Sequence, residues 1–188
     1  MFDMYKPAEK DLFTQTRTIF LYGEVNMAMA YDVGCRLKYL DYMSSSEPIT
    51  IEINSPGGEV TSGLAIIDTM NYVESPIKTV VCGMAASMAA VIAASGTKGM
   101  RYALPHSKIM IHQPLGGFGV SQASDIEIYA KNILQTRREL NEMLAELSGK
   151  SVRTIERDTD RDYYMTAAEA KEYGLIDEIV TRGKERGR

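Results

Sequence analysis

The chain has 188 residues, a length typical of one domain, and its formal net charge of -4 provides no electrostatic footprint for nucleic acid. Hydrophobic residues make up 45% of the sequence and charged residues 24%, which argues against wholesale disorder. With two cysteines and two histidines, neither a disulfide framework nor a metal site is expected. Because the sequence has no apolar run of about 18 residues and no signal-peptide pattern, we expect a soluble, cytoplasmic protein without a membrane partner.

The first half of the sequence alternates between strand and helix patterns. An irregular arm is expected over residues 1–16, with a helical turn near residues 9–13. Strands are then predicted at residues 18–22, 49–54 and 78–81, and helices after the N-cap Asn26 and over residues 61–73. Successive strand and helix units favour an α/β fold with a mostly parallel sheet and right-handed crossovers.

A long helix dominates the second half. Ser124 and Glu127 have the spacing of a capping box, and the pattern that follows predicts a helix to about Leu147, closed by Gly149. At about 1.5 Å per residue this helix is roughly 35 Å long. A helix of that length projects beyond a domain of this size, so its outer half is expected to pack on another copy.

Shorter elements complete the expected domain, which spans residues 17–181. Strands are predicted at 100–104, 108–112 and 175–180, and helices at 152–157 and between the capping box Thr166/Glu169 and Gly174. The second of these strands is followed by a glycine-rich segment at 113–119. The basic tail, residues 182–188, is expected to be disordered.

Ser87 stands within a run of small residues that follows the predicted strand at 78–81. The run, residues 82–90, indicates a strand, a tight turn and a helix. A serine at such a junction lies near a helix N-terminus, whose unpaired N–H groups and positive dipole end would stabilise an oxyanion. The alternative is that Ser87 merely caps the helix.

Few residues could accompany a nucleophilic serine. His112 lies at the C-terminal end of a predicted strand, where α/β sheets commonly place functional groups, whereas His106 follows a proline in a turn and is expected to be exposed. Residues 158–162 supply acidic candidates, although their composition alone indicates a solvated turn. Gly57 and Gly58 follow a strand without the lysine of a phosphate-binding loop, so a tight turn that presents a backbone N–H is the better interpretation.

Six sequence blocks together resemble the proteolytic subunit of the Clp protease. They are INSPGG (53–58), GMAASM (83–88), RYALP (101–105), MIHQP (110–114), ERDTDRD (156–162) and EYGLID (172–177). Their order and spacing extend the resemblance over about residues 18–180. The resemblance implies a crotonase-like (ClpP-like) spiral α/β fold with a projecting helical handle. It also implies a homo-oligomer of two stacked heptameric rings around a chamber, a serine peptidase that needs no cofactor, polypeptide substrates and an AAA+ unfoldase as partner.

The resemblance also assigns residues. It implies a catalytic set of a nucleophile, a general base and an orienting acid, namely Ser87, His112 and Asp162. The oxyanion-hole donors would be the N–H groups of Gly58 and Met88. The residues expected at the substrate are Gly57, Val60, Pro114, Leu115 and Gly116. The contact between rings would use Asp160 and Arg161, and the ATPase would dock at Glu52, Tyr72, Tyr102 and Leu104.

The sequence departs from the family pattern at several places. Ala89 replaces a usual glycine behind the nucleophile, and the loop at 116–124 is one residue longer. Glu52 stands where an aromatic residue is usual, and the N-terminal arm is short, so docking of the unfoldase is expected to be weakened. Other functions stay open at this stage: a catalytically silent ring subunit that serves assembly, a crotonase-type acyl-CoA enzyme, or a serine–lysine dyad with Lys98.

Overall fold

The computed structural model describes residues 13–116 and 122–181. Five parallel strands form the main sheet in the order β1-β2-β3-β4-β7. Their bounds are Thr18–Tyr22, Ile49–Ser55, Ile77–Ala86, Arg101–Ala103 and Glu178–Ile179. β5 (Lys108–Ile111) pairs in parallel with the end of β3, and β6 (Tyr163–Thr166) pairs antiparallel with β5. The predicted mixed α/β fold with a mostly parallel sheet is confirmed, whereas strand β6 was not predicted.

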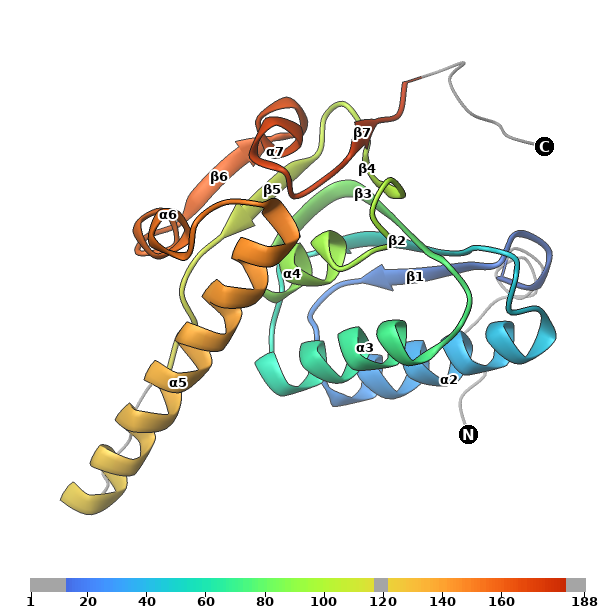
Figure 1. Ribbon diagram of the computed structural model, residues 1–188. Helices are drawn as coiled ribbons and strands as arrows, with labels where there is room; N and C mark the ends of the chain where they lie inside the picture. The colour runs from blue at the N-terminus through green and yellow to red at the C-terminus, as the bar shows by residue number, and fades with distance from the viewer. Residues whose placement is uncertain (1–12, 117–121, 182–188) are drawn as a thin grey trace.

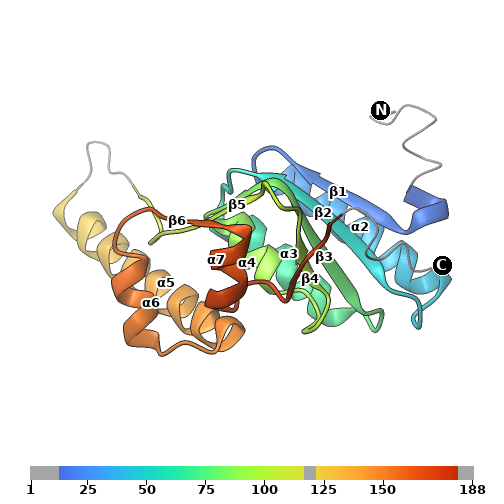
Figure 2. The same cartoon turned by 90° about the horizontal axis from the view of Figure 1, so that it is seen from above.

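Two helices cover one face of the main sheet. α2 (Met27–Met43) and α3 (Val60–Tyr72) lie side by side beneath β1, β2 and β3 (Figures 1 and 2). The predicted cap Asn26 begins α2 by accepting a hydrogen bond from the Met29 N–H at 3.0 Å. Alternating residues of β2, including Ile51 and Ile53, are fully buried, and they form the core of the domain together with the apolar faces of these helices.

The buried helix α4 (Met88–Ala94) lies between the sheet and α5 (Figure 1). All seven of its residues are buried, as expected of a helix that is apolar on every side. The start of this helix corrects the sequence interpretation: residues 83–86, expected as a turn, belong to β3. They remain extended because Ala85 pairs with Ser55 on one side and with Ile109 on the other.

α5 (Ala123–Ser148) projects from the body of the domain, as predicted (Figure 1). Its C-terminal cap is also as predicted, since Gly149 adopts φ +72. The capping box of Ser124 and Glu127 is wrong, because the helix begins after Gln122 without a side-chain cap. Every buried residue of α5 lies in its C-terminal half, while Ile128 in the outer half is 69% exposed.

The remaining elements follow the predictions, except for the length of the last strand and for the helical residues 13–16. α6 (Val152–Asp158) and α7 (Ala167–Tyr173) form, and the capping box of Thr166 and Glu169 before α7 is confirmed. The last strand is shorter than predicted, because only Glu178 and Ile179 pair with β4. Residues 13–16 are helical, whereas the rest of the predicted arm and the tail at 182–188 lie outside the described residues. Within the described part of the chain, no helix is long and apolar enough to cross a bilayer.

Candidate active site

Ser87 lies at a sharp break between β3 and α4. Its backbone adopts φ +56 and ψ -125, a conformation that costs free energy for a residue with a side chain. The N–H of Ser87 donates to the carbonyl of Met110 in β5 at 2.8 Å, which helps to hold this break. Although Ser87 occupies the N-cap position of α4, its side chain makes no capping hydrogen bond. Its hydroxyl is therefore directed elsewhere, and the simple capping role does not apply.

The hydroxyl of Ser87 belongs to a chain of three side chains. Ser87 Oγ lies 2.8 Å from His112 Nε2, and His112 Nδ1 lies 2.9 Å from Asp162 Oδ1. Because β5 and β6 are antiparallel with Ile111 opposite Tyr163, the residues just beyond this pair, His112 and Asp162, come next to each other. The structure thus brings together the three residues that the sequence placed far apart.

The loop that carries Asp162 is fixed from two directions. The N–H of Gln113 donates to the Thr159 carbonyl at 2.7 Å, and the Gln113 side chain donates to the Asp160 carbonyl at 2.9 Å. The buried hydroxyl of Thr159 also donates to Asn141 Oδ1 of α5 at 3.1 Å. His112 is well covered, with 13% of its side chain exposed, but 56% of the Asp162 side chain is accessible in the single chain. The expectation of a solvated turn is therefore met at Asp162 itself.

The Met88 N–H and the Gly57 backbone adjoin Ser87. Met88 is the first residue of α4, so its N–H has no acceptor within the helix. A parallel bridge pairs Val25 with Gly58: the Val25 N–H donates to the Gly57 carbonyl, and the Glu59 N–H donates to the Val25 carbonyl. The Gly58 N–H therefore points away from Val25. The Gly57 backbone lies directly against Ser87: a Cβ on Gly57 would lie 2.7 Å from Ser87 Cβ and 3.0 Å from Met88 N. Only glycine fits there.

An apolar pocket adjoins the Ser87 hydroxyl. Besides Ser87 and His112, it is lined by Val60, Met88, Val91, Ile111, Pro114, Leu140 and Leu144. Of the residues expected at the substrate, Val60 and Pro114 line this pocket and Gly57 lies against Ser87, whereas Leu115 is 81% exposed and Gly116 packs near the Tyr129 ring of α5. The pocket walls that α4 and α5 supply were not predicted from the sequence. Their helical apolar spacing indicated only burial, not proximity to Ser87.

The residues expected at the ATPase do not form one cluster within a single chain. Strand register aligns Glu52 with Val80 and Tyr102 across the open face of the sheet. Tyr72 belongs to α3 in the helical layer on the other side, where it is 79% exposed. Leu104 follows β4 and is half-buried.

Glu52 itself is half-buried and has a partner on the open sheet face. Its carboxylate accepts a hydrogen bond from the hydroxyl of Tyr22 on the neighbouring strand. Burial of the phenol raises the pKa of Tyr22 well above its usual value, and the Glu52 carboxylate raises it further. The phenol therefore stays protonated and is the donor in this hydrogen bond.

Asp160 and Arg161, expected at the contact between rings, stand on the surface beside Asp162. Their side chains are 67% and 93% exposed, and Arg161 Nε lies 3.9 Å from Asp160 Oδ2. Such an exposed pair stabilises a single chain little. His106 is exposed, as predicted. In residues 13–116 and 122–181, no group of three or more histidine, cysteine or acidic residues could hold a metal ion.

Comparison with known proteins identifies the family of this chain. The family model described as Clp protease matches residues 5–183. The chain is 53% identical over 178 residues to the ATP-dependent Clp protease proteolytic subunit 3 of Synechococcus sp. (strain CC9605). It is equally similar to proteolytic subunit 2 of Prochlorococcus marinus (strain NATL2A), and each comparison covers 93% of this chain and 89% of the relative.

Proposed function

Because the chain belongs to the Clp protease family, we propose that it is a catalytically active serine endopeptidase subunit whose nucleophile is Ser87. The observation that carries this proposal is the unbroken chain of hydrogen-bonding distances from Ser87 through His112 to Asp162. A crotonase-type acyl-CoA enzyme would not need these three side chains, and Lys98 has no part in this set. The peptidase domain would comprise residues 17–181 in a crotonase-like spiral.

The proposed reaction is acyl transfer. Ser87 Oγ attacks the peptide carbonyl while His112 Nε2 accepts its proton, and His112 then protonates the leaving amine. Asp162 holds the imidazole with its Nδ1 protonated and stabilises the cation that forms. The N–H groups of Gly58 and Met88 bind the oxyanion, and water activated by His112 then releases the acyl group from Ser87.

The surroundings of Ser87 support a peptide substrate. Gly57 to Val60 on one side and Pro114 to Gly116 on the other would hold an extended peptide as an added strand, which reads the backbone more than the side chains. The walls of the adjoining pocket, including Val91 and Leu144, are apolar. We therefore expect broad specificity with a preference for an apolar side chain before the scissile bond.

A covalent probe and two alanine variants test the assignment of the site. A fluorophosphonate should label Ser87, and Ser87→Ala or His112→Ala should lower peptide cleavage by about three orders of magnitude while the assembly is unchanged. His106→Ala is the matched control, because His106 is exposed and outside the site. Near-normal turnover of purified Ser87→Ala would refute the assignment. Failure of the probe to label the assembled protein would favour a silent subunit instead.

Two stacked heptameric rings around a chamber form the second part of the proposal. The outer half of α5 exposes Ile128 and Leu134, which supports packing of this half against another copy. Asp160 and Arg161 would join the rings and thereby align the neighbouring, largely accessible Asp162. Catalysis would then depend on pairing of the rings.

An AAA+ unfoldase is the third part of the proposal, with weakened docking at the open sheet face. Glu52, Tyr102 and Leu104 lie on this face or at its edge, and Tyr72 would have to come from the helical layer of an adjacent copy. An apolar anchor placed over Glu52 would desolvate its carboxylate, which costs several kcal/mol when the remaining hydrogen bonds are not replaced. The hydrogen bond from Tyr22 reduces this cost only in part.

A further inference from the structure

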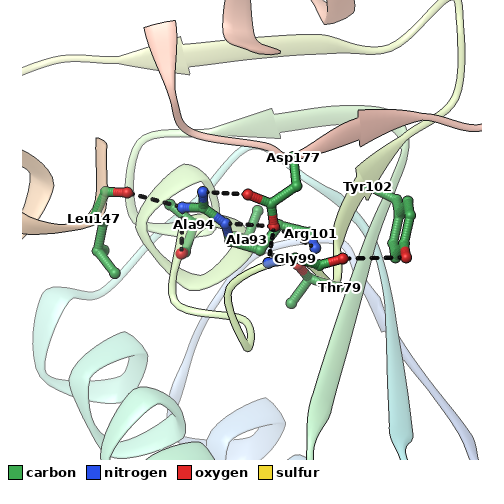
Figure 3. A network of polar contacts seen from close by, with 8 residues as sticks. All are labelled: Thr79, Ala93, Ala94, Gly99, Arg101, Tyr102, Leu147 and Asp177. Atoms are coloured by element: carbon green, nitrogen blue, oxygen red, sulfur yellow. Dashed lines mark hydrogen bonds and ion pairs between the residues drawn. The ribbon is translucent and has the colours of Figure 1, made fainter. Parts of the chain in front are cut away.

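Arg101 and Asp177 form a largely buried polar network (Figure 3). Arg101 pairs with Thr79 near the start of β3, whereas Ser87 follows the end of that strand. Only 4% of Arg101 is exposed, and its guanidinium binds both oxygens of Asp177, with Nη2 2.6 Å from Oδ1 and Nε 3.0 Å from Oδ2. Asp177 Oδ2 also accepts the N–H groups of Gly99 at 2.7 Å and of Arg101 at 3.0 Å. Both residues lie in sequence blocks that resemble the family, but neither has a place in the proposed reaction.

The same guanidinium joins the C-terminal ends of two helices. Arg101 Nη1 donates to the carbonyl of Leu147 in α5 at 2.9 Å and to that of Ala94 in α4 at 3.3 Å. Carbonyls at a helix C-terminus lack partners within the helix and carry the negative end of its dipole, so a cation is favourable there. Thr79 holds only one of the two helices, by donating to the Ala93 carbonyl at 2.7 Å (Figure 3).

Both helices contribute walls to the pocket beside Ser87, and they pack against each other. Val91 lies one turn before Ala94 in α4, and Leu144 lies one turn before Leu147 in α5. At about 1.5 Å per residue, each wall residue is roughly 4.5 Å along its helix from the carbonyl that Arg101 holds. A change in the distance between the two carbonyls is therefore transmitted to the pocket with little loss.

We propose that Arg101, held in place by Asp177, is a positioning residue that sets the width of the pocket beside Ser87. It thereby sets the selectivity for the substrate side chain that precedes the scissile bond. This inference rests on the proposed function, since the pocket matters only if Ser87 is the nucleophile. The planar guanidinium is needed because one group must contact a carboxylate and two carbonyls in fixed directions, which an ammonium group cannot do.

The test compares two peptides that differ only in having leucine or alanine before the scissile bond. We expect wild type to favour leucine in kcat/KM by about tenfold or more, and Arg101→Lys to reduce this ratio by at least about threefold. A loss of folded enzyme would lower both rates equally and leave the ratio unchanged. Lys171→Gln is the matched control, because it removes an exposed ion pair, between α7 and Glu178 on β7, in place of the buried one.

Labelling of Ser87 by a small fluorophosphonate distinguishes failure of the proposed function from failure of the positioning role of Arg101. Unlabelled wild type would refute the proposed function, and the inference with it. Normal labelling of Arg101→Lys with an unchanged leucine to alanine ratio would refute only the positioning role. If Arg101→Lys does not fold, Asp177→Asn decides by the same criterion, because it keeps the shape of the side chain and removes the charge that fixes Arg101.

Discussion

Gly63 of α3 makes room for Met88, whose N–H is the proposed oxyanion donor next to Ser87. A Cβ on Gly63 would lie 2.9 Å from Met88 Cε and 3.0 Å from Sδ, and closer still to Cγ. Because carbon atoms in contact are about 3.5–4.0 Å apart, Gly63→Ala must displace the Met88 side chain by roughly 1 Å. Met88 is 2% exposed and lines the pocket beside Ser87, so its displacement would also change that pocket.

Gly63→Ala should affect both stability and kcat. Overpacking of a core typically costs about 1–3 kcal/mol of stability. In addition, a shift of about 1 Å in a catalytic group can cost about 100-fold in rate, and loss of one oxyanion donor costs about 100- to 1000-fold in kcat. Since the Met88 backbone would move less than its side chain, we expect Gly63→Ala to lower kcat by about 10- to 100-fold.

Steady-state cleavage of a short peptide and denaturant unfolding measure the two effects. The double variant Gly63→Ala/Met88→Ala removes the three Met88 side-chain atoms that clash. Its kcat should be at least about tenfold higher than that of Gly63→Ala. Gly34→Ala is the matched control, because Gly34 is also a helical glycine and its Cβ would only touch Thr69 Oγ1 at 3.7 Å. If Gly63→Ala keeps the kcat of wild type, catalysis does not require Met88 to be held in this position.

Three further predictions concern charged residues. Burial alone would raise the pKa of Asp177, but the hydrogen bonds and positive charge of Arg101 outweigh it and lower this pKa. The contribution of Asp177 to stability is therefore complete above about pH 4 and is lost as the pH falls below that value. The gap in unfolding free energy between wild type and Asp177→Asn should narrow below about pH 4. Arg161→Ala should yield single rings with at least about tenfold lower peptide cleavage, and full activity in rings that no longer pair would contradict the coupling to Asp162. Glu52→Tyr should increase ATP-dependent degradation of a folded protein by a Clp-type unfoldase about tenfold without changing short-peptide cleavage, and equal degradation by both proteins would exclude the proposed effect of the carboxylate.

Local patterns predicted most of the helices and strands. The cap Asn26, the capping box of Thr166 and Glu169, and the stop at Gly149 are each decided by residues within one turn, so the sequence identifies them directly. The capping box at Ser124 failed, since a matching spacing does not require that the side chains bond. The extension of β3 over residues 83–86 also could not be predicted, because small residues suit a helix equally well and only pairing with β2 and β5 keeps them extended.

The pocket was the part of the site least accessible to sequence reasoning. Its lining residues come from four segments far apart in the sequence, and apart from Ser87 and His112 each has the ordinary apolar character of a core position. Val60 follows a block that resembles the family and Pro114 belongs to one, so both could be identified. Leu140 and Leu144 adjoin no such motif, and their place beside Ser87 depends on how α5 packs on α4.

The short strand β5 explains how the distant catalytic candidates meet. On one side it pairs with the end of β3, and its Met110 carbonyl accepts the N–H of Ser87. On the other side it pairs with β6, which brings Asp162 opposite His112, the residue immediately after β5. Because one four-residue strand contacts both partners, a shift of its register by one residue would turn His112 to the opposite face of the sheet. The geometry of the site is therefore set by strand pairing. The hydrogen bonds among the three side chains are a consequence of that pairing and not its cause.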